Sequence, residues 1–333
     1  MSIVAEAPGW LQVFSDGTVK RFAPEIAPPS ADPAAGFKSR DVVIDQSKRI
    51  TGRVFVPADY EPGADAKLPV VVYFHGGGFC IGSTTWLGYH VFLGQLSAAA
   101  ACVVLSVDYR LAPEHKLPTA YEDCHRALEW LWEERDRSDN WLDRADLSHV
   151  FLAGDSAGGN IVHNVAVGNI LCKSFTPKFD DHPLRIKFLG NGSLSFSPKG
   201  LILIHPYFGS ERRTPKEAEA DSSEEVAMND MFWKLSLPEG TDRDYPGSNY
   251  EKLEVGAGAW RRDFPATVVF VAEVDFLKER GVMYAEFLKR EGVVDVELAE
   301  TKNESHVFHV FRPDSEATRV LTQQIVEFMS RRR

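Results

Sequence analysis

A serine flanked by small residues ends an apolar run in the middle of the chain, where residues 151–160 read FLAGDSAGGN. Gly154, Ser156 and Gly158 form the pattern G-x-S-x-G, in which a sharp strand-to-helix turn exposes a serine hydroxyl. The turn strains the serine backbone, so the residues two positions away must lack bulk. The pattern alone also describes an ordinary turn of small residues. Because the pattern stands here at the end of an apolar run, it predicts a strand-to-helix turn with Ser156 as a nucleophile.

A second glycine-rich segment, HGGGF at residues 75–79, directly follows the apolar run PVVVYF. Glycines at the end of a strand allow backbone N–H groups to approach the carbonyl oxygen of a substrate above the serine. His75 is expected to support this turn and not to transfer a proton. The stretch HGGGFCIGS fits neither a dinucleotide-binding glycine pattern nor a phosphate-binding loop, which argues against nucleotide binding. We therefore predict an oxyanion hole formed by Gly76, Gly77, Gly78 and Ala157.

A serine hydroxyl reacts only when a base removes its proton, and that base needs an acid to orient it. In a sheet of parallel strands the expected order along the chain is serine, acid and histidine, each after a strand. Asp275 ends the run TVVFVAEVD, and His306 follows the run DVELAE. We therefore predict a triad of Ser156, Asp275 and His306.

Other residues compete for these roles. Glu273 and Glu279 are alternatives for the acid, although one falls within the predicted strand and the other at the start of the next helix. His309 lies three residues beyond His306 and is expected to be a packed or capping residue. The other histidines lack a matching acid, and no histidine pair has metal-ligand spacing beside a third ligand. We therefore predict neither a metal ion nor a cofactor.

The runs that precede these residues indicate the fold. Continuous apolar segments are typical of strands that are buried on both faces, and helical stretches such as 118–135 separate them. This alternation predicts one α/β domain over residues 1–333, with a mostly parallel sheet and helices on both faces. Residues 41–45 and 52–57 are expected to add an antiparallel pair. The predicted buried strands are 69–74, 102–109, 149–155, 200–207, 267–275 and 295–300.

Three segments interrupt the alternation. Residues 1–40 are rich in Pro, Ala and Asp and are expected to form an arm that docks on the domain. Residues 209–262 form a long excursion, which we expect to build a lid together with the arm. Its large apolar residues either line a pocket or form the core of the lid itself. Residues 172–199 are expected to be an irregular insertion.

The combined motifs resemble those of the hormone-sensitive-lipase group of α/β-hydrolases. The matching segments are HGGGFCIGS, VDYRLAPEHKLPTAYEDC, GDSAGGNIVH, the stretch from Asp275 to Leu277 and the stretch from His306 to Phe308. Within this group, YFGSERRT and SLPEGTDRDYPGSN resemble plant carboxylesterases, the branch related to the gibberellin receptor. The resemblance implies an α/β-hydrolase fold and the hydrolysis of small, apolar metabolite or hormone esters through an acyl-enzyme.

The same resemblance leaves two other functions open. The gibberellin receptor has this fold but an aliphatic residue at the position of the catalytic histidine, whereas this chain has His306. Relatives of the plant esterases also include dehydratases and cyclases. A non-catalytic hormone receptor and a dehydratase or cyclase are therefore the alternatives to an esterase.

Composition limits the partners. The chain has 37 Lys and Arg against 48 Asp and Glu residues, and the net charge of −11 disfavours binding to nucleic acid or anionic lipid. No stretch predicts a signal peptide or a membrane span, so we expect a cytoplasmic protein. The four cysteines lack paired spacing and are expected to be reduced. The expected partner is a small-molecule ester, and the pattern indicates no oligomeric state.

Overall fold

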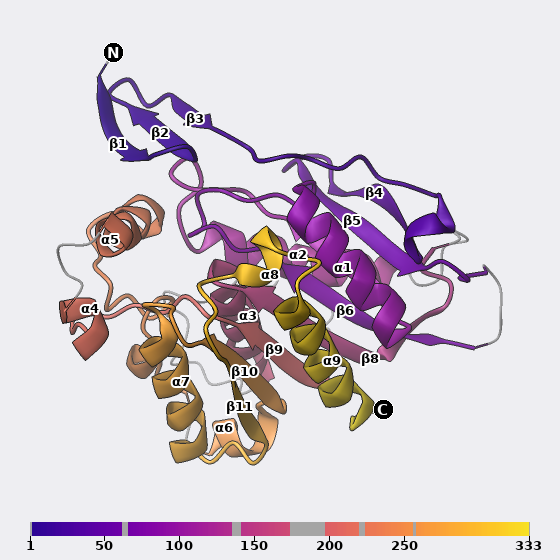
Figure 1. The fold of residues 1–333 in the computed structure, drawn as a ribbon. Coiled ribbons are helices and arrows are strands. Elements are labelled where there is room, and N and C mark those ends of the chain that lie inside the picture. Colours follow the sequence, from indigo (N-terminus) through magenta and orange to yellow (C-terminus); the bar gives the residue numbers. More distant parts are fainter. Residues whose placement is uncertain are drawn as a thin grey trace.

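A computed structural model describes residues 2–61, 66–134, 141–173, 197–219, 224–255 and 258–332. Within these residues, an eight-stranded sheet has the order β11-β10-β9-β8-β6-β7-β5-β4 (Figure 1). The six strands from β11 to β7 pair in parallel, whereas β5 and β4 join antiparallel at one edge. The chain therefore has the predicted mostly parallel sheet with one antiparallel edge.

The strands and helices alternate along most of the chain. The strands are β1 (Ile3–Ala7), β2 (Leu11–Phe14), β3 (Val19–Arg21), β4 (Phe37–Asp45), β5 (Ile50–Pro57), β6 (Leu68–Phe74), β7 (Val103–Asp108), β8 (Ala145–Asp155), β9 (Gly200–Ile204), β10 (Thr267–Ala272) and β11 (Val296–Thr301). The α-helices are α1 (Leu87–Ala100), α2 (Thr119–Glu134), α3 (Ala157–Lys173), α4 (Pro215–Glu219), α5 (Glu224–Ser236), α6 (Ala259–Asp263), α7 (Lys278–Arg290), α8 (Phe308–Phe311) and α9 (Glu316–Ser330).

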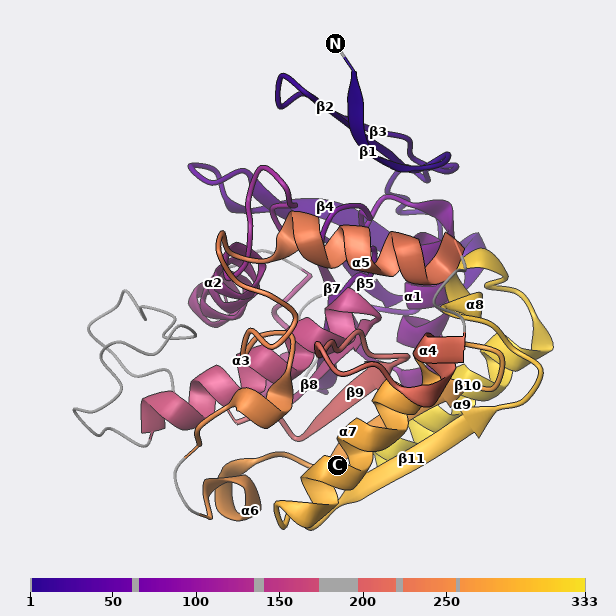
Figure 2. The same ribbon diagram turned by 90° about the vertical axis from the view of Figure 1, so that its left-hand side faces the viewer.

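The central strands are apolar because helices cover both faces of the sheet. Every residue of β9 and β10 is buried, as are the last five residues of β6. Helices α1 and α9 pack together on one face, while α2, α3 and α7 lie on the other (Figures 1 and 2). Burial on both faces explains why these strands have continuous apolar sequences instead of alternating ones.

The predicted strand boundaries were wrong at two carboxyl ends. Strand β10 ends at Ala272, so Asp275 lies in the following turn and does not close the strand. Strand β9 ends at Ile204, and His205 already has a left-handed backbone with φ 48°. Both differences place polar side chains beyond the sheet edge, where they face the end of β8.

The arm is shorter and more ordered than its composition indicates. Residues 37–40 belong to β4 in the main sheet, so the predicted boundary at residue 40 was wrong. Before them, β1, β2 and β3 form a separate three-stranded antiparallel sheet. Arg21 ties this sheet to the body, because its guanidinium donates hydrogen bonds to the carbonyl oxygens of Cys80 and Ala112.

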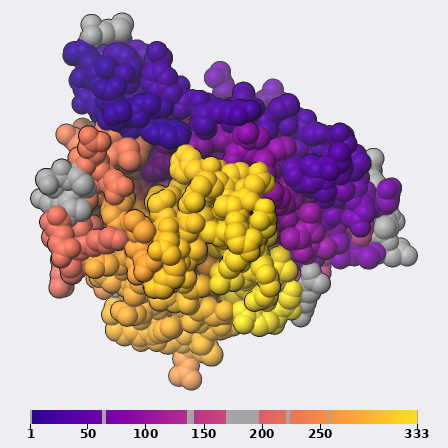
Figure 3. Space-filling model, in the orientation of Figure 1, coloured from indigo at the N-terminus to yellow at the C-terminus, as the bar shows by residue number. Residues whose placement is uncertain are grey.

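The excursion at residues 209–262 contains α4, α5 and α6. Helix α5 lies directly beneath the three-stranded N-terminal sheet in both ribbon views, and the two segments lie close together in the space-filling view (Figures 1, 2 and 3). Helix α6 lies elsewhere, since its Trp260 stacks on His163 of α3 with a ring separation of 6.0 Å. Most of the predicted insertion at 172–199 lies outside the described residues.

Candidate active site

Ser156 occupies a tight turn between β8 and α3. Its φ is 51°, in the left-handed region that non-glycine residues rarely adopt. Its N–H donates to the carbonyl of Ile204 and its carbonyl accepts from Tyr207, both at 2.9 Å. A Cβ on Gly158 would lie 1.8 Å from the carbonyl oxygen of Phe74, and one on Gly154 would lie 2.5 Å from the Gly158 backbone. The two glycines are therefore required by close packing.

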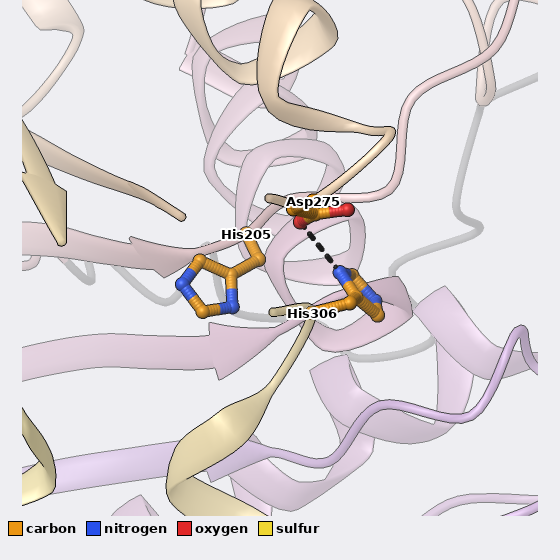
Figure 4. A group of neighbouring side chains, drawn as sticks. All are labelled: His205, Asp275 and His306. Carbon is orange, nitrogen blue, oxygen red and sulfur yellow. Dashed lines mark hydrogen bonds and ion pairs between the residues drawn. The ribbon is translucent and has the colours of Figure 1, made fainter. Parts of the chain in front are cut away.

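The side chains of Ser156, His306 and Asp275 form one hydrogen-bonded row. The Nε2 atom of His306 lies 2.9 Å from the Ser156 Oγ, and its Nδ1 lies 2.7 Å from the Asp275 Oδ2. Asp275 is fixed in turn, because its Oδ1 accepts the N–H of Leu277 at 2.8 Å. Figure 4 shows the contact between His306 and Asp275, with the carboxylate facing the imidazole ring. The carboxyl ends of β8, β10 and β11 thus bring three distant residues together.

Electrostatics favour a proton on His306 next to an ionised Asp275. Burial alone would lower the pKa of His306, but the charge and hydrogen bond of Asp275, with the charges of Asp155 and Glu225, together outweigh it, so the pKa is raised. Burial would raise the pKa of Asp275, yet the contact with His306 holds it below the ordinary value. The pair can therefore carry an imidazolium while the carboxylate stays charged, as proton transfer from a serine requires.

The alternative residues do not reach this row. Glu273 accepts the backbone N–H of Asn303 at 2.9 Å, and Glu279 accepts that of Lys216 at 3.0 Å. His309 is fully buried, with its Nε2 atom 3.4 Å from the hydroxyl of Tyr73. His309 is thus a packed residue.

His205 is a neighbour of the row, although the sequence indicated an isolated histidine at this position. Its ring lies 5.8 Å from the ring of His306, and its Nδ1 accepts the backbone N–H of Val307 at 2.9 Å. Burial lowers its pKa to about 3, so the ring is neutral and can accept this bond. The sequence placed His205 inside the predicted strand 200–207, so its position beyond β9, at the same sheet edge as Ser156, was apparent only from the structure.

The HGGGF loop lies beside Ser156, but one predicted donor faces elsewhere. The N–H of Gly76 donates to the Tyr89 hydroxyl at 2.9 Å and to the Asp155 Oδ1 at 3.1 Å. Including Gly76 in the oxyanion hole was therefore wrong, since its N–H is already used. Among the described residues, the N–H groups of Gly77, Gly78 and Ala157 have no such acceptor.

Asp155 contacts the HGGGF loop through Gly76, and the sequence analysis did not predict this role. Its buried carboxylate accepts the hydroxyls of Tyr73 at 2.8 Å and Tyr89 at 2.9 Å, besides the N–H of Gly76. Burial raises the pKa of Asp155 to about 6, although these hydrogen bonds and the charge of His306 oppose the shift. The residue before the nucleophile thus fixes the backbone of the glycine loop.

A pocket of about 310 Å³ opens onto Ser156 and His306. Trp10 from the N-terminal arm and Phe311 from α8 form part of its wall, with their rings 5.9 Å apart. Helix α5 contributes Met228, Asn229 and Phe232. Of the large apolar residues predicted in the lid, only Phe232 lines this pocket. Trp233 instead stacks on Tyr207 at 4.2 Å and packs near Phe79, so it belongs to the main hydrophobic core of the domain.

The ligand atoms of His205, Asp275 and His306 lie within 4.8 Å of one another (Figure 4), a spacing that also suits a metal ion. However, His306 Nδ1 already contacts Asp275, and the Nδ1 of His205 accepts a backbone N–H. A metal ion would have to displace these contacts. These nitrogen and oxygen atoms are therefore better suited to hydrogen bonding within the site than to binding a metal ion.

The chain matches a known protein family over most of its length. The model of the alpha/beta hydrolase fold family aligns with residues 71–310, which include Ser156, Asp275 and His306. The chain is similar to the Arabidopsis thaliana "Probable carboxylesterase 2", with 37% identity over 96% of this chain and 94% of that protein. "Probable carboxylesterase 6" from the same plant is 36% identical over 92% and 85% of the two chains.

Two further comparisons concern a relative with a different named activity and a solved structure. A "2-hydroxyisoflavanone dehydratase" of Glycyrrhiza echinata is 32% identical over 98% of this chain and 95% of that protein. The crystal structure of an esterase from Pyrobaculum calidifontis superposes with a TM-score of 0.68 and 28% identity, and covers 88% of this chain and 84% of its own. Other relatives have "chloroplastic" or "mitochondrial" in their names. In the described part of this chain, no helix has the length and apolar character needed to cross a bilayer.

Proposed function

The chain belongs to the α/β-hydrolase family, and we infer that it is a serine carboxylesterase that acts on small-molecule esters. The observation that carries the assignment of roles is the position of His306, which contacts both Ser156 and Asp275. We propose Ser156 as nucleophile, His306 as general base and Asp275 as the group that orients the imidazole.

Acylation begins at the Ser156 hydroxyl. As Oγ attacks the ester carbonyl, its proton moves to His306 Nε2, 2.9 Å away in the resting enzyme. Asp275 accepts the Nδ1–H, so the tautomer with a free Nε2 is favoured and the imidazolium that forms is stabilised. We propose that the N–H groups of Gly77, Gly78 and Ala157 bind the oxyanion. His306 then donates its proton to the departing alcohol.

Deacylation uses the same groups in reverse. A water molecule attacks the acyl carbonyl, and His306 Nε2 removes its proton. The second oxyanion forms in the same amide cradle, and the proton returns to Ser156 as the acid leaves. Loss of one oxyanion donor costs roughly 10²- to 10³-fold in rate in enzymes of this kind.

We propose that the arm and α5 together cover the pocket as a lid. Trp10 and Phe232 support this proposal, because each lines the pocket from one of these segments. Phe232 also packs on the glycine loop, since a Cβ on Gly78 would lie 2.8 Å from its ring. The lid is thus built onto the oxyanion loop.

A dehydratase is the second candidate, favoured by the similarity to the Glycyrrhiza echinata protein. In that case His306 would remove a carbon-bound proton, the hydroxyl group on the neighbouring carbon would leave with that proton as water, and no acyl-enzyme would form on Ser156. The site does not favour a non-catalytic receptor, because the proposed base His306 is present and contacts the proposed nucleophile Ser156. The cytoplasmic location and the absence of a nucleic-acid partner stay predictions.

Hydrolysis of 4-nitrophenyl acetate and butyrate, with mass spectrometry after an organophosphate, tests the esterase assignment. We expect turnover and a single adduct on Ser156, and Ser156→Ala should lose both. Ser330→Ala, at an exposed position near the end of α9, is the matched control. An unlabelled Ser156 with no hydrolysis at any acyl length would overturn the esterase. An elimination that survives in Ser156→Ala would favour the dehydratase.

A further inference from the structure

The pocket has an uneven distribution of charge. Among the described residues that line it, Glu225 and Asp155 are carboxylates outside the triad, and none is a lysine or arginine. Asp155 is buried and receives three hydrogen bonds from Tyr73, Tyr89 and Gly76. Glu225 is exposed, and the described contacts include no hydrogen bond or ion pair of its side chain. The pocket therefore contains an uncompensated negative charge at Glu225.

Three basic residues that contact α5 or Asp275 are already engaged. Arg213 and Arg243 both pair with Asp230, and Arg243 also contacts Glu211. Lys216 donates to the carbonyl oxygen of Asp275 at 2.9 Å and does not line the pocket. Apart from His306 in its protonated form, a negatively charged substrate would therefore find no cation among the described residues that line the pocket.

Glu225 acts on the reacting groups at a distance. Its negative charge contributes to the raised pKa of His306, after the effects of burial, Asp275 and Asp155. A second negative charge in the pocket would be repelled by the same carboxylate. Because Glu225 is exposed, solvent screens this repulsion in part.

The aromatic part of the wall is a poor environment for an anion. The ring centroid of Trp10 lies 5.5 Å from that of Trp86 and 5.9 Å from that of Phe311. A carboxylate placed against these rings would lose hydration without gaining a hydrogen-bonding partner. Neutral groups lose less hydration energy when they enter the pocket. Cations are attracted to the faces of aromatic rings.

We propose that this site selects esters that carry no negative charge in either their acyl or their alcohol part, and that Glu225 is a residue that determines this specificity. The proposal rests on the proposed esterase activity, and it names the class of substrate for that activity. Esters with a free carboxylate or phosphate are rejected.

The test compares two substrates that differ only in charge. The mono(4-nitrophenyl) ester of adipic acid has a terminal carboxylate, and its terminal amide analogue is neutral, of the same size and also polar. At pH 8 and low salt we expect kcat/KM for the amide to exceed that for the acid by about tenfold. The ratio should fall as salt is added, because salt screens an exposed charge.

Variants of one position separate charge from shape. Glu225→Gln keeps the size of the side chain and should lower the ratio about threefold, and Glu225→Lys should bring it near one or invert it. Glu224→Gln, at the neighbouring exposed residue outside the pocket, removes the same net charge and should leave the ratio unchanged. The ratio also cancels any effect of these variants on His306.

The outcomes distinguish the two proposals. Equal hydrolysis of both esters by the native protein, or a ratio that Glu225→Lys does not change, would overturn the charge selectivity while the esterase stands. A ratio that falls equally in Glu224→Gln would assign the effect to net charge and overturn the role of Glu225. Failure to hydrolyse either ester, together with 4-nitrophenyl butyrate, would overturn the esterase itself.

Discussion

The imidazole of His205 accepts the backbone N–H of Val307 at 2.9 Å, immediately after the proposed catalytic base. Val307 has a φ of 45°, and His205 has a φ of 48°, so both ends of this bond lie in strained backbone. The bond joins the end of β9 to the loop that carries His306. His205 thus positions the base without touching the serine.

We expect His205→Ala to lower kcat about tenfold and to change KM little, because the unpaired N–H of Val307 would loosen the His306 loop. His205→Asn offers a carbonyl oxygen as acceptor and tolerates a left-handed backbone, so it should recover part of the loss. The measurement is steady-state hydrolysis of 4-nitrophenyl butyrate. Equal kcat in the native protein and in His205→Ala would refute this positioning role.

The raised pKa of His306 predicts the acid side of the pH profile. The base must be neutral to accept the serine proton, so kcat/KM should fall as pH drops through the pKa of His306. In Asp275→Asn the charge that raises this pKa is gone while burial remains, so the midpoint should move to lower pH. We also expect kcat to fall by about 10⁴-fold. A fluorogenic ester gives the sensitivity needed, and a midpoint that stays or rises would contradict the assignment.

Gly158 should tolerate no side chain. Because an added Cβ would meet the Phe74 carbonyl oxygen at 1.8 Å, Gly158→Ala should lose about 3 kcal/mol or more of unfolding free energy. At Gly159 the nearest atoms lie at 3.1 Å on Pro206, and an alanine favours the helix, so Gly159→Ala should cost less than about 1 kcal/mol. Urea unfolding followed by fluorescence measures both values. Similar losses at the two positions would show that the turn can relax.

Tyr89 should matter for the rate more than Tyr73 does. The Tyr89 hydroxyl accepts the N–H of Gly76 and donates to the carboxylate of Asp155. The Tyr73 hydroxyl also donates to this carboxylate, but it does not contact Gly76. Tyr89→Phe should therefore loosen the glycine loop and lower kcat about tenfold, with less change in Tyr73→Phe. Rates of ester hydrolysis for the two variants provide the comparison. A larger loss in Tyr73→Phe would place the support of the loop elsewhere.

The sequence predicted the parts of the site that depend on strand ends. Ser156, Asp275 and His306 each follow a strand of a parallel sheet, and such ends meet at one edge. The apolar runs predicted those strands because burial on both faces requires them. This order places the proposed triad residues at one edge of the sheet, whereas their hydrogen bonds depend on the loops that follow the strands.

The direction of individual backbone groups could not be predicted. Gly76 was expected to face the substrate, but Asp155 and Tyr89 turn its N–H away, and both contacts depend on folding over long sequence distances. The same holds for Trp10, whose place in the pocket depends on the pairing of three short strands. Those strands are only three to five residues long, and β2 alternates only between buried and half-buried residues, so the pattern is too short to identify them.

The outer wall of the pocket includes Trp10, which lies between β1 and β2, while the reacting atoms come from loops after β8, β10 and β11. Helix α5 is not independent of the reaction, because its Phe232 packs on the glycine loop. Substitution of Trp10 can therefore alter which esters enter while the bond-breaking groups stay in place.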